Sequence, residues 1–385
     1  MDPALKTNRR NNFDLLRVLA ALQVVQSHAT EHLQVIPGPL GQRVNDVLAL
    51  FPGVAIFFVI SGFLISQSYE RAPGIGAYMR NRVLRIYPAL WVCFGVSLAM
   101  LAGFGVLTRS VLASPSFWMW TTGQLTIAQF FNPDALRTFG VGVLNGSLWT
   151  IPVEVEFYIL LPLVYRLCVR GRSRTASTAI LGAVALSSFA VWCLWQQRLA
   201  IGDVRTKLLQ VTLAPHLFMF LLGMMLQRNW DRLAPLFEGR AALWLGAYLG
   251  ERAIERAVWG SPASVLAAGA AYSALASAAW FGLLALVVVS VAHTWRGASQ
   301  RTLRGHDISY GIYIYHMLVV NLFVQLHLIG SSVALASVIA VTIGAATASW
   351  ICVERPALRL KQSRPRAVTA AGALAVSFAT PLSIR

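Results

Sequence analysis

Apolar runs of about twenty residues recur along nearly the whole chain, and only short polar segments separate them. Runs of this length match the apolar stretch that an α-helix needs to cross a bilayer. The polar segments are too short to bury a core of their own. The pattern therefore predicts an all-α fold, a polytopic transmembrane bundle of ten or eleven spans with no separate soluble domain.

The apolar runs also set the expected bounds of the spans. We expect a cytoplasmic tail over 1–12, a transmembrane domain over 13–357, and a basic linker with a possible extra span over 358–385. An aromatic, interrupted segment over 108–146 predicts a re-entrant or interfacial hairpin, because another span there would invert the basic loops that follow. The expected spans are 13–34, 51–68, 86–107, 147–168, 176–197, 208–227, 238–258, 264–292, 307–328, 332–353 and, as an eleventh candidate, 367–383.

Charge supports a membrane protein. Only 12% of the 385 residues are charged, the formal net charge is +17, and soluble domains carry about twice that charged fraction. The basic residues gather between apolar runs, as the positive-inside rule describes, and no nucleic-acid-binding motif is present. We therefore expect no nucleic-acid partner, and Lys6, Arg9 and Arg10 predict a cytoplasmic N-terminus.

Ionisable side chains interrupt the first expected span. Asp14, Arg17, His28 and Glu31 fall within about 60° of one line along an ideal helix, and Arg17 and His28 differ by about 20°. Charged groups inside a span are costly, so this stripe must face protein or water rather than lipid. Arg17 and His28 are about 16 Å apart along the axis, with Arg17 nearer the cytoplasm.

Two interpretations of this stripe stay open on geometry alone. Its length suits an extended anionic cofactor that enters from the cytoplasm, with Arg17 at the charged part and a neutral His28 as general base. The other interpretation is a buried ion pair and a hydrogen-bonded histidine that only hold helices together. Buried Arg, His and Glu side chains would also suit a transporter or flippase of a lipid-linked glycan or a solute.

The expected fourth span opens with polar and aromatic residues. Trp149, Glu154, Glu156 and Tyr158 all lie near its start. Glu154 and Glu156 point about 200° apart on an ideal helix, so we do not expect both to face one site.

Two further clusters are candidates for binding. Ser309, Tyr313 and His316 share one face of the ninth expected span, where His316 is either a structural hydrogen-bonder or a direct participant. Arg82 and Arg85 lie at a cytoplasmic helix start, where arginine pairs well with phosphate, although an ordinary positive-inside cluster has the same composition.

One motif suggests zinc. The sequence from His28 to His32 matches H-x-x-E-H, and two histidines at i and i+4 on a helix can bind that metal. Five-residue patterns occur often by chance, and no third ligand is evident. We therefore expect no metal site.

Several of these stretches also resemble a known family, in the family's order. They are FDLLRVLAALQVVQSH, GVAIFFVISGFLIS, RNRVLRIYP, SLWTIPVEVEFYILLP, SYGIYIYH and the closing ERP. Together they cover about residues 11–357 and resemble membrane acyltransferase family three, the bacterial O-acetyl and O-acyl transferases of exopolysaccharide, O-antigen, Nod factor and related glycans.

The resemblance implies a multi-pass enzyme of the bacterial inner membrane. Its donor substrate would be acyl-CoA, most often acetyl-CoA, with no tightly bound cofactor. Its acceptor would be a glycan or lipid-linked sugar, reached directly or through a glycan-assembly partner, since the extracytoplasmic domain of some relatives is not found in this sequence.

The resemblance also implies roles for residues. Glu156 falls where many relatives carry glutamine, which leaves its role open. The implied set is His28, Arg17, Asp14 and Glu154 in catalysis, Arg17, Arg82 and Arg85 at the donor, and Trp149, Tyr158, Ser309, Tyr313 and His316 in support or substrate binding.

Overall fold

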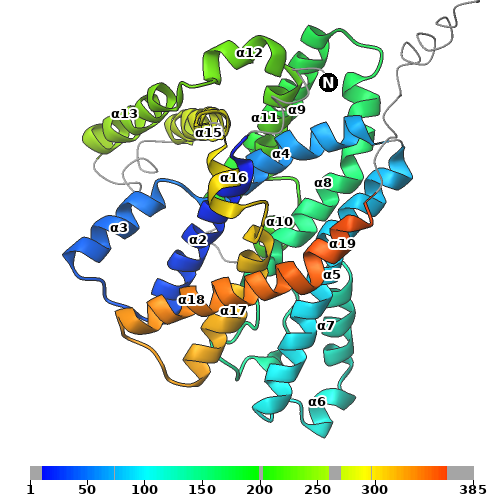
Figure 1. Ribbon diagram of the computed structural model, residues 1–385, viewed down its shortest axis with the longest axis vertical. Helices are drawn as coiled ribbons and strands as arrows, with labels where there is room; N and C mark the ends of the chain where they lie inside the picture. Colours follow the sequence, from blue (N-terminus) through cyan, green and yellow to red (C-terminus); the bar gives the residue numbers. More distant parts are fainter. Residues whose placement is uncertain (1–10, 73, 199–202, 260–269, 296, 362–385) are drawn as a thin grey trace, which may run out of the picture.

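The computed structural model describes residues 11–361 except 73, 199–202, 260–269 and 296, and in these residues it contains helices and turns but no strand (Figure 1). The all-α prediction is therefore confirmed for the described chain. The helices are α2 (Phe13–His32), α3 (Pro39–Ala49), α4 (Gly53–Arg71), α5 (Ile75–Gly103), α6 (Arg109–Ala113), α7 (Pro115–Leu125), η1 (Asp134–Leu136), η2 (Gly146–Trp149), α8 (Thr150–Val164), η3 (Tyr165–Val169), α9 (Arg174–Arg198), α10 (Val204–Gln210), α11 (Leu217–Arg228), α12 (Trp230–Phe237), α13 (Ala241–Trp259), α15 (Ala270–His293), α16 (Ala298–Leu303), α17 (Ser309–Gln325), α18 (Ser332–Ser349), η5 (Trp350–Glu354) and α19 (Arg355–Arg359).

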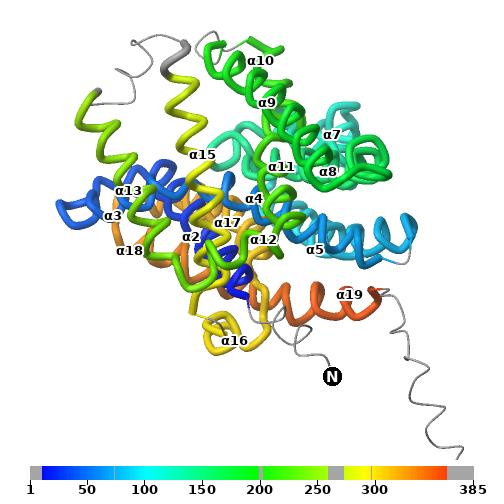
Figure 2. The backbone as a smooth tube through the Cα atoms, turned by 90° about the horizontal axis from the view of Figure 1, so that it is seen from above, coloured from blue at the N-terminus to red at the C-terminus, as the bar shows by residue number. Residues whose placement is uncertain are grey.

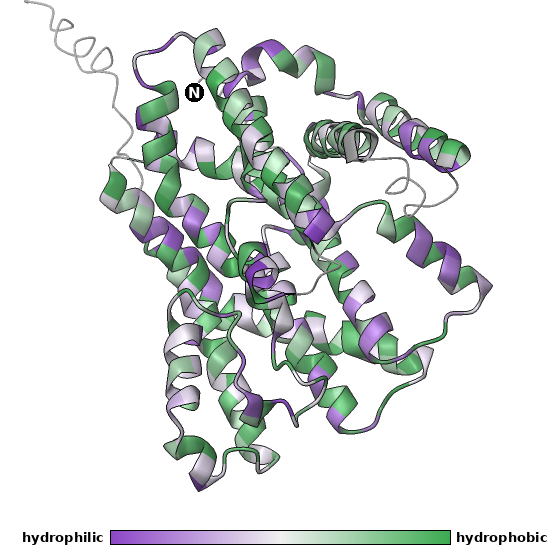
Figure 3. Ribbon diagram, turned by 180° about the vertical axis from the view of Figure 1, so that it is seen from behind, coloured by the Kyte–Doolittle hydropathy of each residue, from purple (hydrophilic) through white to green (hydrophobic). Residues whose placement is uncertain are grey.

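Within the described residues, six helical segments are long and apolar enough to cross a membrane. They are Pro39–Arg71, Ile75–Gly103, Gly146–Val169, Arg174–Arg198, Ser273–His293 and Ser332–Arg359. Large apolar side chains are exposed, among them Leu186 at 69% and Leu194 at 61%. Figure 3 shows hydrophobic residues along most of the helices, with hydrophilic ones between them. Exposed apolar side chains suit contact with lipid. The total of ten or eleven spans stays a prediction, and the candidate over 367–383 lies outside the described residues.

Two expected boundaries are wrong. Helix α5 begins at Ile75 and not at residue 86, so Arg80, Arg82 and Arg85 lie within the helix and not before it. The span expected over 208–227 is two helices, α10 and α11, joined by a turn over 211–216. Pro215 lies in that turn and disfavours helical geometry at the residue before it, which explains the break.

The segment expected to form a hairpin over 108–146 contains α6, α7 and η1. Helix α7 packs against α5. Thr108 and Ser114 cap α6 and α7, respectively, because each hydroxyl accepts a backbone N–H of the first turn. Re-entry of this segment into a membrane stays a prediction.

Helix α2 lies between two hydrophobic clusters. Phe13 and Val24 belong to a large cluster that includes residues of α4, α5, α8, α11 and α15. Val25 and Ala29 belong to a smaller cluster with α17 and α18. This packing holds α2 against α4 and α17, so polar groups of α2 can meet partners from both.

Helices α4 and α11 approach each other closely at two glycines. A Cβ atom on Gly62 would collide with the carbonyl oxygen of Phe220, and one on Gly223 would collide with the carbonyl oxygen of Val59. Small residues at such crossings let helix backbones approach in membranes. The glycines therefore set the distance between the two helices.

We expect Gly223→Ala to destabilise the protein by about 1–3 kcal/mol, because the backbones must separate to admit the methyl group. The measurement is the midpoint of thermal denaturation in detergent. Gly182→Ala is the matched control, since a Cβ atom on that helical glycine meets nothing within 4 Å. Equal midpoints for both variants would contradict this account of the crossing.

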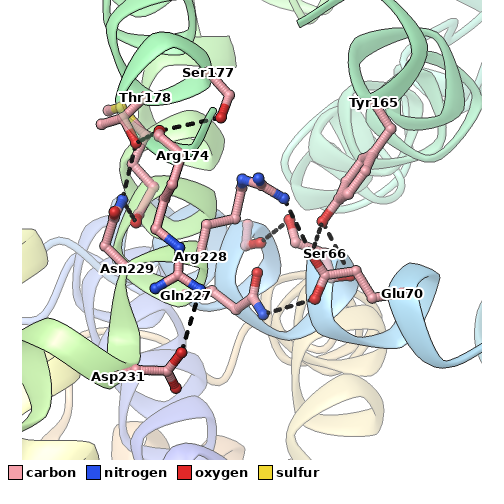
Figure 4. A network of polar contacts seen from close by, with 12 residues as sticks. Ser66, Glu70, Tyr165, Arg174, Ser177, Thr178, Gln227, Arg228, Asn229 and Asp231 are labelled. Carbon is pink, nitrogen blue, oxygen red and sulfur yellow. Dashed lines mark hydrogen bonds and ion pairs between the residues drawn. The ribbon is translucent and has the colours of Figure 1, made fainter. Parts of the chain in front are cut away.

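A polar network joins one end of α4 to η3 and α11 (Figure 4). The carboxylate of Glu70 accepts hydrogen bonds from the Tyr165 hydroxyl at 2.9 Å, from Gln227 Nε2 at 3.1 Å and from Arg228 Nη1 at 3.3 Å. These contacts fix one end of α4, a helix that also lines the cavity described next.

Candidate active site

A cavity of about 50 Å³ lies between α2, α4, α5, α8 and α17. Apolar side chains such as Phe57, Phe58 and Ile151 form much of its wall. The candidate site residues that line it are Arg17, Arg85, Glu154, Tyr158, Ser309 and Tyr313.

An ionic cluster forms one part of this cavity. Asp307 Oδ2 lies 3.2 Å from Arg17 Nη1 and 2.5 Å from Arg85 Nη2, and Glu354 Oε2 lies 3.8 Å from Arg85 Nη1. The Ser309 hydroxyl donates to Asp307 Oδ1 at 2.5 Å. These side chains are mostly buried, with Arg85 11% and Asp307 13% exposed. The two carboxylates therefore compensate the two guanidinium groups.

Asp307 is a site residue that the motifs did not single out. It precedes α17 within the stretch HDISYG, and an acidic residue at the start of an apolar helix is itself a signal of function. Glu354 belongs to the closing ERP, and the π-helical turn η5 ends at this residue. Short π-helical segments often occur at functional sites.

Arg82 differs from the other two arginines. Its Nη2 donates to Ser68 Oγ at 3.1 Å, and its guanidinium lies over the rings of Tyr158 and Tyr78 at 5.5 and 5.9 Å. No carboxylate of the described residues forms an ion pair with it, and its Nε has no hydrogen-bond partner among them. Arg82 therefore retains donor capacity for an anion.

His28 and His316 form a direct pair. His28 Nδ1 lies 2.9 Å from His316 Nε2, and His316 Nδ1 lies 2.7 Å from the carbonyl oxygen of Tyr313. A carbonyl only accepts, so His316 Nδ1 carries a proton, and in a neutral ring its Nε2 then accepts from His28 Nδ1. Neutral His28 therefore keeps the lone pair of Nε2, the form that a general base requires.

Tyr313 connects the histidine pair with the cavity. Its hydroxyl contacts Thr150 Oγ1 at 2.7 Å and donates to the carbonyl oxygen of Ser147 at 2.8 Å. Its ring centroid lies 5.9 Å from that of His316. Tyr313 lines the cavity, whereas neither histidine is among the lining residues.

The two glutamates of α8 point to different neighbours, as their angular separation predicts. Glu154 Oε1 accepts from the Tyr158 hydroxyl at 2.5 Å and from Ser61 Oγ at 3.3 Å, inside the cavity. Glu156 Oε2 accepts the backbone N–H of Leu213 at 2.7 Å. Glu156 therefore holds the turn before α11 rather than the cavity.

Asp14, Glu31 and Trp149 do not line this cavity. Arg17 and His28 both reach residues of the α17 segment, as the stripe on α2 predicts, whereas Asp14 and Glu31 are exposed. The Trp149 ring packs on His216, 5.3 Å between centroids. Within the described residues, no three His, Cys, Asp or Glu side chains are placed to hold a metal ion.

Comparison with known proteins adds independent evidence. A family model described as an acyltransferase domain matches residues 10–354. Nodulation protein 10 of Rhizobium leguminosarum bv. viciae is 34% identical over 363 residues, which is 93% of this chain and 95% of that protein. An O-acetyl transferase of Shigella phage Sf6 is 34% identical over 158 residues, 40% of this chain and 45% of the phage protein.

A third relative, acyltransferase MdmB of Streptomyces mycarofaciens, is 28% identical over 155 residues, 40% of this chain and 38% of that protein. No solved structure matches the chain significantly. The family model spans nearly all the described residues, and the Rhizobium protein aligns along almost its whole length. This chain therefore belongs to membrane acyltransferase family three.

Proposed function

We propose that this chain is an integral-membrane O-acyltransferase that moves an acyl group, in the first instance acetyl, from acyl-CoA to a hydroxyl of a glycan or lipid-linked sugar. One observation carries the proposal. Arg17, Arg85 and Tyr313 line one cavity, and Asp307 forms ion pairs with both arginines. Tyr313 also packs against His316, the partner of His28. Family membership favours acyl transfer over the transport alternative.

The donor would enter at the arginines. Arg82 has no carboxylate partner among the described residues, so it is the first candidate for the phosphates of acyl-CoA. Arg85 and Arg17 already pair with Asp307. Because Asp307 compensates their charge, Arg17 and Arg85 would position the donor beside the cavity without adding much net charge to the site. The pantetheine arm would extend past Arg17 toward Tyr313.

The proposed chemistry needs one base. His28 Nε2 would take the proton of the acceptor hydroxyl as its oxygen attacks the thioester carbonyl. The carbon–sulfur bond then breaks, and the CoA thiolate leaves with the proton returned by His28. Glu154 would position Tyr158 at the cavity wall. Asp14 is exposed, and no contact assigns it a step in this scheme.

The proposal includes an orientation and partners. The basic residues before α2 favour a cytoplasmic N-terminus in a bacterial inner membrane, which would give the arginines access to cytoplasmic acyl-CoA. The acceptor would then come from the opposite side. Transfer to it would be direct or would pass through a glycan-assembly protein.

A truncated donor tests the role of Arg82. We expect Arg82→Ala to raise KM for acetyl-CoA by about tenfold or more, because a charged hydrogen bond contributes about 1.5–3 kcal/mol. KM for acetyl-pantetheine, which lacks the nucleotide phosphates, should not change. The measurement is thiol release by purified protein.

Arg80→Ala is the matched control, because Arg80 is exposed on the same helix. It should leave both KM values as in the unmodified protein. A rise of equal size for both donors in Arg82→Ala would show that Arg82 supports the fold rather than the phosphates.

A further inference from the structure

A second and larger cavity lies on the other side of the start of α8. It has a volume of about 440 Å³ and lies between α5, α7, α10 and the segment over 129–146. Aromatic rings of Trp120, Phe130 and Trp149 line it together with the amide side chains of Gln129 and Gln210. Lys207 contributes a positive charge at its α10 side.

Gln129 has an unused hydrogen-bond acceptor in this cavity wall. Its side chain is 3% exposed, and its Nε2 donates to the carbonyl oxygen of Thr126 at 2.7 Å. Its Oε1 has no partner among the described residues. An unpaired buried polar atom costs about 1–3 kcal/mol, so Gln129 keeps an acceptor beside the cavity that the hydrogen bonds of the fold do not use.

The two cavities share a wall. Gly146 and Trp149 line the second cavity, while Thr150 and Ile151, the next two residues, line the first. Tyr313 ties this wall in place through its bonds to Ser147 and Thr150. A ligand in the second cavity would therefore lie within one helical turn of groups that line the first.

The second cavity also lies toward a different face of the molecule from the arginines. Figure 2 shows α10, which lines it, at the upper edge, and α19, which directly follows Glu354, at the lower edge. Donor and acceptor would thus approach from opposite faces. That separation suits a reaction that joins a cytoplasmic donor to an acceptor on the other side.

We propose that the second cavity binds the sugar acceptor, an inference that rests on the proposed function. Aromatic rings that line a cavity together with amide donors and acceptors match the apolar faces and hydroxyl edges of pyranose rings. A lipid tail would need no amide groups, and a nucleotide would need more than Lys207, the one cation among the described residues that line the cavity. The ligand class is therefore a glycan.

The test measures how the acyl groups released from acetyl-CoA are divided between carbohydrate esters and free acetate. Purified protein is incubated with labelled acetyl-CoA and with membranes from a host strain that lacks this gene, as the acceptor source. Label in alkali-labile esters of carbohydrate is then compared with label in free acetate. We expect Gln129→Leu, Lys207→Ala and Leu208→Trp to lower the ratio of ester to acetate by about tenfold.

We expect Lys207→Ala and Leu208→Trp to leave the fold intact. Lys207 and Leu208 are exposed on α10, and a tryptophan at 208 would fill cavity space without displacing the core. Arg205→Ala removes a charge from the same helix outside the cavity lining and should keep the ratio of the unmodified protein.

A normal ratio in all three cavity variants would overturn this inference. Failure of the proposed function would look different, because the unmodified protein would then release no CoA thiol at all.

Discussion

We expect replacement of His28 by alanine to lower O-acylation of the proposed host glycan by about 10²–10⁴-fold, the usual contribution of a general base. Because Nδ1 of His28 donates its proton to His316, Nε2 of the neutral ring keeps a free lone pair and can accept a proton. Alanine removes the base without adding bulk. The measurement is alkali-released acetate from the cell-envelope carbohydrate, at equal amounts of membrane-inserted protein.

His32→Ala is the control for this result. His32 lies one turn further along α2, with its ring centroid 6.0 Å from that of His28. It should keep acylation close to that of the unmodified protein. Normal acylation in His28→Ala would remove His28 from the mechanism and leave it the structural role that the sequence also allows.

Asp307→Ala produces the largest expected loss of stability, about 3–5 kcal/mol, because two mostly buried arginines lose their shared carboxylate. Arg85 would keep only Glu354, 3.8 Å away, and Arg17 would keep no ion pair among the described residues. The measurement is the midpoint of thermal denaturation in detergent.

Asp134→Ala is the matched control, since Asp134 is 95% exposed and its ion pair with Arg137 lies at the surface. Exposed pairs contribute little, so its midpoint should hardly change. A midpoint for Asp307→Ala equal to that of this control would show that the cluster does not stabilise the fold.

Much of this fold is predictable from the apolar pattern because a membrane helix must be long and apolar. The expected bounds of α2 and α9 lie within two residues of the observed ones. The pattern fails where a turn depends on a distant partner. Pro215 is a local signal for the break before α11, but the contact that holds the turn is between the carboxylate of Glu156 and the N–H of Leu213, and no local signal indicates it.

The candidate site is also predictable only in part. Helical periodicity places Arg17 and His28 on one face of α2, and both do reach the α17 segment. It cannot tell which helices are neighbours, so the convergence of Arg17, Arg85 and Glu354 around Asp307 could not be predicted. The same limit applies to the second cavity, whose lining comes from segments far apart in the chain.

The most direct measurement is transfer of label by the purified protein. Detergent-solubilised protein is given acetyl-CoA labelled in the acetyl group and host membranes that lack this gene product. The account predicts that label appears in alkali-labile carbohydrate esters as CoA thiol is released, and that His28→Ala gives neither. Intact acetyl-CoA and unlabelled carbohydrate after incubation with the folded, unmodified protein would contradict it.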